Sequence, residues 1–163
     1  MSRSDPLTRS DPTSKDHLRL WLRLLKVNRR IEAELRERLR QTFGTTLPRF
    51  DVMSALYRHE AGLKMSQLSR LLMVSNGNVT GIVDRLGEDG LILREAVPGD
   101  RRAARVRLTR KGRDAFAVQA RAHEGWVSEL LGGLDGAGSA DAALLLKQAL
   151  TLNIEGEDDA QGS

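Results

Sequence analysis

The residues of this sequence best suited to binding chemistry are arginines. Between Gly99 and Gly112 the chain reads GDRRAARVRLTRKG, with five arginines, one lysine and one aspartate. Residues 94–113 carry eight basic and two acidic side chains, a net charge of +6. Cations packed this closely repel one another, and the repulsion is relieved when phosphates bind and release their counterions. The segment therefore indicates binding of a polyanion, with nucleic acid as the first candidate.

A second group of polar side chains lies upstream, in the stretch SNGNVTG at residues 75–81. The amides of Asn76 and Asn78 can bond N6 and N7 of adenine, and the methyl group of Thr80 suits a thymine methyl. Ser75 is a good helix N-cap, and a cap can also touch phosphate. Local capping and turn formation are the alternative roles of the two asparagines. The predicted DNA-contacting residues are Ser75, Asn76, Asn78, Thr80, Arg85, Arg101, Arg102 and Arg105.

Hydrophobic periodicity predicts the elements that position these side chains. We expect a long helix over residues 16–43, ended by Gly44, and a second helix that starts at Pro48 and is broken by Gly62. Short helices follow over 65–72 and from Ser75 to Gly90. Strands over 91–95 and 105–108, joined by the turn at 98–100, form a hairpin. We expect helices over 110–131 and 140–153, the latter capped by Ser139, with a loop at 132–138.

Helix, tight connection, helix and basic hairpin follow one another in the order of a winged helix-turn-helix. The predicted fold class is mainly α with a small β-hairpin. The second helix of the pair can enter the major groove, and the hairpin can reach the backbone or the minor groove. Arg101 and Arg102 lie at the predicted hairpin tip, and Asp100 can form a salt bridge with Arg102 that orients its guanidinium.

The first helix is too long to be covered by so small a domain. Its 28 residues span about 40 Å, and its stripe at three- and four-residue steps, apolar except for Asn28, is made of Leu18, Trp21, Leu25, Asn28, Ile31, Leu35 and Leu39. A second copy of the chain is the natural cover for such a stripe. We expect a flexible arm over 1–15, a dimerisation region over 16–45 and 110–153, a DNA-binding lobe over 46–109 and an acidic tail over 154–163.

Composition argues against several classes of protein. There is no cysteine, and His17, His59 and His123 are scattered, so no metal site is expected. No apolar run is long enough for a membrane span or a signal peptide, and we expect a cytoplasmic protein. Neither a catalytic motif nor a nucleophile–base pair is recognisable, so we expect no catalytic residue and no cofactor. A small hydrolase stays the enzyme alternative.

Several motifs in order resemble the multiple antibiotic resistance regulator (MarR) family. Its wing signature is matched by Gly90-Leu91-Ile92, by Asp100-Arg101-Arg102 and by Leu108-Thr109-Arg110-Lys111-Gly112. Residues 68–74 and 79–86 match its helix-turn-helix, and the resemblance covers about residues 16–153. It implies a homodimer that places two recognition helices and two wings on a palindromic operator and is released by a small anionic, often aromatic ligand. The chain departs from many relatives at Gly81, where they carry a basic residue.

A closer resemblance concerns the branch that senses aromatic acyl-CoA thioesters such as hydroxycinnamoyl-CoA. It is carried by residues 18–25, 43–51 and 74–81. It implies a repressor of aromatic acid catabolism whose effector is p-coumaroyl-CoA or feruloyl-CoA, with cations to bind the phosphates of coenzyme A. The predicted ligand-binding residues are Arg19, Trp21, Arg23, Lys26, Arg49, Phe50 and Met53.

Three alternatives stay open at this point. The effector can be a free phenolic or aromatic carboxylic acid in place of a thioester. The protein can also be an architectural DNA binder without any effector, which would show a steep salt dependence and little sequence preference. Trp21 can lie in the dimer core and not in a ligand cleft. The basic residues of the first helix can form a solvated face and not a phosphate site.

Overall fold

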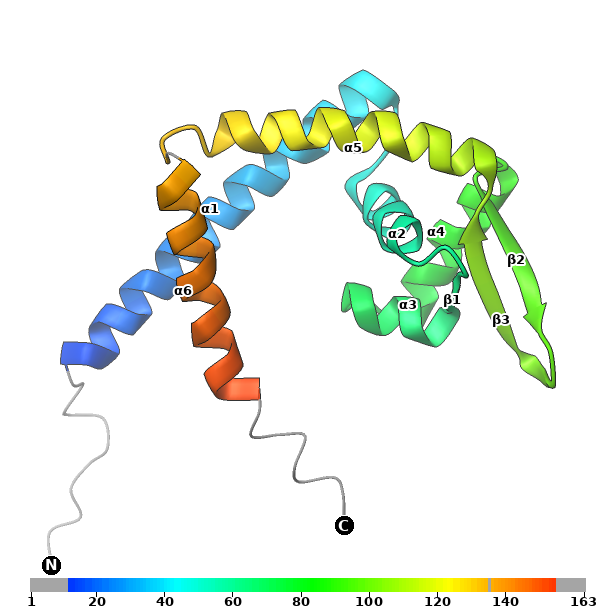
Figure 1. Cartoon of the computed structure of the whole chain (residues 1–163), viewed down its shortest axis with the longest axis horizontal. Helices are drawn as coiled ribbons and strands as arrows, with labels where there is room; N and C mark the ends of the chain where they lie inside the picture. The colour runs from blue at the N-terminus through cyan, green and yellow to red at the C-terminus, as the bar shows by residue number, and fades with distance from the viewer. Residues whose placement is uncertain (1–11, 135, 155–163) are drawn as a thin grey trace, which may run out of the picture. The chain divides into compact units, whose positions relative to one another are not determined.

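The computed structural model describes residues 12–134 and 136–154, which form two compact units divided after Trp126. They are mostly helical with one small antiparallel sheet, which confirms the predicted fold class. The elements, labelled in Figure 1, are α1 (Pro12–Phe43), α2 (Leu47–Arg58), β1 (Leu63–Lys64), α3 (Met65–Leu72), α4 (Asn76–Glu88), β2 (Ile92–Val97), β3 (Asp100–Leu108), α5 (Arg110–Leu130) and α6 (Gly136–Ile154).

Helix α1 starts four residues before the expected position, because Pro12 is well suited to a first helical turn that needs no N–H donor. It ends as expected at Phe43, and Gly44 follows with a φ of 60° and donates its N–H to the carbonyl of Arg40 at 3.0 Å. Residues 12–15 of the expected arm are therefore helical. The rest of that arm and residues 155–163 of the expected tail lie outside the described residues.

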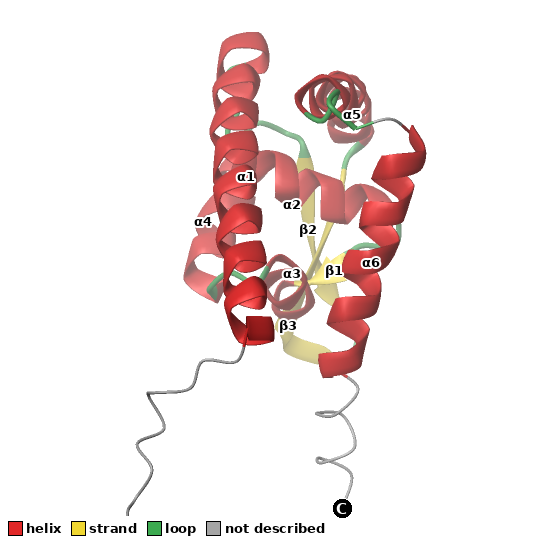
Figure 2. Cartoon of the chain, turned by 90° about the vertical axis from the view of Figure 1, so that its left-hand side faces the viewer, coloured by secondary structure: helices red, strands yellow, loops and turns green. Residues whose placement is uncertain are grey.

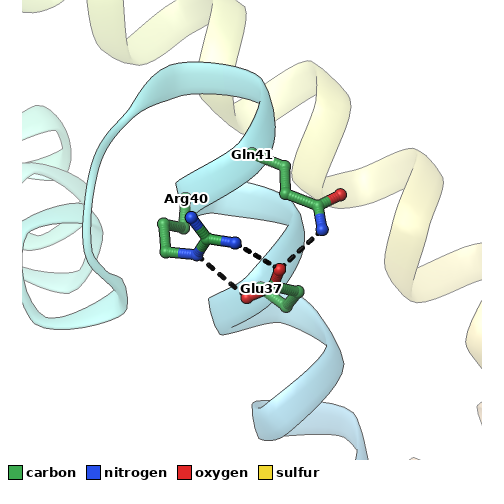
Figure 3. A network of polar contacts seen from close by, with 3 residues as sticks. All are labelled: Glu37, Arg40 and Gln41. Atoms are coloured by element: carbon green, nitrogen blue, oxygen red, sulfur yellow. Dashed lines mark hydrogen bonds and ion pairs between the residues drawn. The ribbon is translucent and has the colours of Figure 1, made fainter.

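Polar side chains near the C-terminal end of α1 find hydrogen-bond partners within the same helix. Arg40 and Gln41 both bind the carboxylate of Glu37, one turn earlier (Figure 3). These bonds, the one from Arg40 first, lower the pKa of Glu37. The cluster is exposed, which fits a solvated helix face.

Helices α2 and α3 begin and end close to the predicted positions. Thr46 caps α2 by accepting a hydrogen bond from the N–H of Arg49 at 3.3 Å, and Pro48 lies in the first turn. After α2 the chain turns at Gly62 with a φ of 83°, and a Cβ there would lie 2.6 Å from the carbonyl oxygen of Val106. This close approach lets β1, which the sequence analysis did not predict, pair with β3.

The sheet has the strand order β1-β3-β2 and is antiparallel throughout. Its strands are drawn in yellow in Figure 2. Both strands of the hairpin are longer than predicted, and Asp100, expected in the turn, already pairs with Val97. The register slips between Ala96 and Val97, and Gly99 turns the chain with a φ of 82°. The basic tip is thereby held on a paired ribbon.

The hydrophobic core lies where α2, α3, α4 and the sheet meet the ends of α1 and α5. Along β3, Val106 and Leu108 face this core, as strict alternation predicts. Rings of α2 and α5 also meet in it: Phe50 lies 5.3 Å from Phe116, between ring centroids. Its buried members are Leu39, Leu47, Phe50, Val52, Met53, Ala55, Leu56, Leu63, Leu68, Val79, Val83, Leu86, Ile92, Val106, Leu108 and Phe116.

The second unit contains the end of α5 and α6. The turn after α5 is held by bonds from Leu131 to the carbonyl of Val127 and from Leu134 to that of Leu131. Helix α6 begins at Gly136, so Ser139 lies inside the helix and is not its cap, and the expected loop is shorter. Glycine weakens a helix by only about 1 kcal/mol, so the alanine- and leucine-rich run that follows can extend it backwards.

Candidate nucleic-acid interface

Helix α4 presents a polar, exposed face at its N-terminal end. Ser75 caps it, accepting a hydrogen bond from the N–H of Asn78 at 3.4 Å, as the sequence predicted. Val79, Val83 and Leu86 form the buried face at helical spacing. Five of the predicted DNA-contacting residues are exposed at the start and along the outside of this helix: Ser75, Asn76, Asn78, Thr80 and Arg85.

Thr80 and two glycines leave only short side chains on part of the exposed surface of α4. The hydroxyl of Thr80 donates to the carbonyl oxygen of Asn76 at 2.8 Å, so its hydrogen is used within the helix. Gly77 and Gly81 follow at helical spacing, and a Cβ on either would meet no atom within 4 Å. Neither packing nor backbone conformation therefore requires glycine at these positions.

The β2–β3 hairpin carries the exposed basic tip at its end away from α5 (Figure 1). Arg101 and Arg102 are both exposed. The carboxylate of Asp100 accepts a hydrogen bond from the backbone N–H of Arg102 at 3.0 Å. In place of the predicted salt bridge, the Asp100 carboxylate thus makes a side-chain to main-chain hydrogen bond within the turn, and the Arg102 side chain stays exposed. Among the described contacts, no ion pair joins the two side chains.

The arginines further along β3 are engaged with the fold. Arg105, predicted to contact DNA, is half-buried and donates to the carbonyl of Ala61 at 3.3 Å. Arg107 pairs with Glu95 on the neighbouring strand at 2.7 Å, which raises the pKa of Arg107 and lowers that of Glu95. The two arginines at the tip are therefore the better placed to meet a partner.

Two ion pairs that no sequence pattern indicated join α4 to neighbouring elements. Asp84 of α4 binds Arg94 of β2 at 2.9 Å, which ties the helix to the hairpin. Asp89, the C-cap residue of α4, forms an ion pair with Arg49 of α2, and its carbonyl accepts a bond from Lys111 of α5 at 2.8 Å. Arg49 and Asp89 are 40 residues apart, so no local pattern pointed to the pair.

The predicted ligand-binding residues do not form one site in the structure. Phe50 and Met53 are core residues, 5% and 1% exposed, because the apolar face of α2 packs inward. Arg49 is paired with Asp89, although its Nε is buried without a partner. The other four residues are exposed on the N-terminal half of α1: Arg19, Trp21, Arg23 and Lys26. Lys26 is 13 residues from the buried Leu39, about 20 Å along the helix.

Two of the hollows among the described residues of the first unit have no predicted ligand-binding residue in their lining. One, of about 220 Å³, lies between α2 and the end of α3, lined by Asp51, Ser54, Ala55, Arg58, His59, Leu71 and Leu72. Burial and then the charge of Glu32 raise the pKa of Asp51 there. The other, an open hollow of about 400 Å³, lies between α4 and β2 and is lined by Val83, Asp84, Gly87, Glu88, Ile92 and Arg94.

Within residues 12–134 and 136–154, no three side chains of the His, Cys, Asp or Glu type gather closely enough to hold a metal ion. In the same residues, no helix combines the length and the hydropathy needed to cross a membrane. The exposed polar residues of α4 and the basic hairpin tip therefore remain the candidate binding site in the described part of the chain.

Comparison with known proteins identifies relatives of this chain. The family model described as "MarR family" matches residues 45–104, which hold α2 to α4 and most of the hairpin. A curated relative, the uncharacterized HTH-type transcriptional regulator YkoM of Bacillus subtilis, is 33% identical over 72% of this chain and 75% of its own length. In three other curated relatives the matched part is shorter, at 64%, 45% and 39% of their lengths.

Solved structures extend the similarity over nearly the whole described chain. A MarR family transcriptional regulator from Silicibacter pomeroyi is 30% identical with a TM-score of 0.74, over 87% of this chain and 98% of that one. A mutant MarR from E. coli, solved in complex with operator DNA, is 28% identical with a TM-score of 0.70, over 86% and 99%. The chain therefore belongs to the MarR family of transcriptional regulators.

Proposed function

We propose that this protein is a dimeric transcriptional repressor that binds a palindromic operator and is released by a small aromatic ligand. The observation that carries the proposal is that α4 with its exposed polar residues and the hairpin with its exposed arginine pair are joined by the Asp84–Arg94 ion pair. Support also comes from the E. coli relative, which was solved with operator DNA.

In this proposal the first turns of α4 lie in the major groove. Asn76 and Asn78 bond adenine edges, and the Thr80 methyl packs on a thymine methyl. Ser75 lies at the helix N-terminus, where free N–H groups attract phosphate. Arg85, on the same helix, is long enough to reach the backbone. Because the Thr80 hydroxyl donates to the carbonyl of Asn76, that side chain contributes an apolar contact.

The wing supplies the second contact. Arg101 and Arg102 reach the backbone or a narrow minor groove, whose negative potential attracts arginine. Arg105 contributes mainly by holding β3 against the chain at Ala61. The Asp84–Arg94 ion pair fixes the hairpin relative to α4, so both contacts are presented together.

The N-terminal half of α1 is proposed to dimerise. Among its apolar side chains, five are more than half exposed: Leu18, Leu20, Trp21, Leu22 and Val27. Soluble monomers rarely expose so many large apolar side chains on one short segment, and a second copy would cover them. A two-fold axis then presents two α4 helices, which matches a palindromic site.

We propose that the effector is an aromatic acid or its CoA thioester. Arg19, Arg23 and Lys26 follow one another at four- and three-residue steps, so they share one face of α1 over about 10 Å. Such a row of exposed cations suits the phosphates of coenzyme A. The effector must bind the DNA-free arrangement more tightly than the DNA-bound one, because equal affinity for both would shift nothing.

The test is fluorescence anisotropy with duplexes from upstream of the gene for this protein. The protein is titrated at two salt concentrations, with and without p-coumaroyl-CoA, feruloyl-CoA and the free acids. Specific binding abolished only by a thioester supports the acyl-CoA effector, and release by a free acid supports the free-acid alternative. Binding with a steep salt slope but no sequence preference would contradict the repressor and favour an architectural protein.

A further inference from the structure

Met73, the C-cap residue of α3, has a backbone conformation that suits glycine. Its φ is 53° and its ψ is 37°, in the left-handed region, and its N–H donates to the carbonyl of Arg70 at 3.2 Å. In the described residues it is the one non-glycine position with a positive φ. The other positive-φ positions are all glycines: Gly44, Gly62, Gly90 and Gly99. The backbone therefore does not account for a methionine here.

Packing within the chain does not account for it either. The Met73 side chain is 93% exposed, although methionine is usually a core residue. The next residue, Val74, is 40% exposed. A flexible apolar side chain on a strained backbone gains nothing from this fold. Such an outlier points to a function outside the chain's own packing.

The turn that carries Met73 is held firmly against α3. The N–H of Val74 donates to the carbonyl of Ser69 at 3.2 Å, and the Ser69 hydroxyl donates to the carbonyl of Val74 at 2.6 Å. Ser69 itself is buried. Two residues after Met73, Ser75 caps α4. The thioether is therefore presented from a fixed position at the edge of the surface assigned to DNA.

We propose that Met73 contacts the apolar surface of DNA, either a thymine C5-methyl group or the deoxyribose next to it. The inference rests on the proposed function, since it needs α4 in the major groove. Continuity with Ser75, Asn76 and Asn78 places the side chain where the DNA would run. An uncharged, polarisable thioether on a flexible chain adapts to such a surface without competing for hydrogen bonds.

The test compares Met73→Gly and Met73→Leu with the wild-type full chain on a duplex whose protected site has been footprinted. Glycine suits the backbone, so Met73→Gly should fold at least as stably, yet its Kd for the duplex should rise about fourfold or more, the factor for one buried methyl group. Met73→Leu keeps the apolar side chain and should bind nearly as the wild type. Leu93→Ala, which shortens an exposed apolar residue of β2 away from the hairpin tip, is the matched control and should bind as the wild type.

Replacing single thymines of the duplex by uracil distinguishes the two DNA surfaces. If one replacement weakens the wild type but not Met73→Gly, the contact is a thymine methyl. If Met73→Gly is weakened and no replacement matters, it is the deoxyribose. Unchanged affinity of Met73→Gly, or a changed oligomeric state in sedimentation, would overturn the inference while the proposed function stands. Absence of specific binding by the wild type would overturn both.

Discussion

Arg49 of α2 and Asp89 at the C-terminal end of α4 form an ion pair beside the first turn of α5. The Arg49 side chain is only 23% exposed, and Lys111 of α5 donates to the Asp89 carbonyl. Three helices thus meet at one residue. The hydrogen bond from Arg49, followed by its charge, lowers the pKa of Asp89. This junction lies at the C-terminal end of α4.

We expect Asp89→Asn to reduce the loss of stability in acid. Because the folded-state pKa of Asp89 lies below the ordinary value of 3.8, its stabilising contribution is present above that value and is lost as the pH falls through the folded-state pKa. Urea unfolding of wild type and variant between about pH 5 and pH 2.5 measures this. Arg49→Gln removes the same contact and should give the same reduced acid sensitivity, and an acid limb unchanged in both would contradict the assignment.

Gly112→Ala should destabilise the fold. A Cβ at Gly112 would lie 2.0 Å from the carbonyl oxygen of Leu91, a main-chain atom that cannot move without disturbing the start of β2. We expect a loss of about 3 kcal/mol or more in the free energy of unfolding. Gly125→Ala, on the same helix α5, meets nothing within 4 Å and should stabilise by about 0.5–1 kcal/mol. Equal unfolding midpoints for the two variants would refute the steric argument.

Local patterns worked well around the wing where partners are close in sequence. The Thr109 hydroxyl accepts a bond from the N–H of Gly112, three residues on, so this cap can be recognised from the sequence, whereas its bond to the carbonyl of Gly90 cannot. Helix boundaries at Ser75, Pro48 and Gly44 were predictable for the same reason.

Features that depend on distant partners could not be predicted. Strand β1 is two residues long and exists because Leu63 pairs with Val106. The burial of Phe50 and Met53 illustrates the same limit. Their spacing predicts an apolar face on α2 but does not distinguish a core from a ligand cleft. Asp100 does bond Arg102, as expected, but it accepts from the backbone N–H and not from the predicted guanidinium, because the main-chain donor lies within reach of the carboxylate.

His123→Phe should flatten the pH dependence of stability on the acid side of neutrality. The imidazole stacks on Phe50 with ring centroids 4.5 Å apart, and burial lowers its pKa below 6.5. The unfolded chain therefore takes up a proton at a higher pH than the folded chain, so stability falls as the pH drops below 6.5. Phenylalanine keeps the stack without the proton. Unfolding by urea at about pH 7.5 and pH 5.5 measures the difference, and the exposed His17→Gln serves as control.

Gly81→Ala should separate stability from DNA affinity. A methyl group there meets no atom of the chain, so the helix should gain about 0.5–1 kcal/mol. If α4 lies in the major groove, the same methyl group must push against the DNA, and Kd should rise about tenfold. Gly125→Ala should gain stability without any change in Kd. A Gly81→Ala variant that binds DNA as tightly as wild type would show that this face is not the contact surface.

Arg102→Ala tests the wing. The Asp100 carboxylate bonds the main chain of residue 102 and not its guanidinium, so the turn should survive and stability should change by less than about 0.5 kcal/mol. Kd for the operator should rise about 5- to 100-fold, and the slope of log K against log salt should fall by about 1. Arg107→Ala removes the same charge from β3, but its guanidinium is paired with Glu95, and a smaller loss of affinity is expected. Equal losses in both variants would mean that net charge alone attracts DNA, which is the behaviour of a sequence-independent binder.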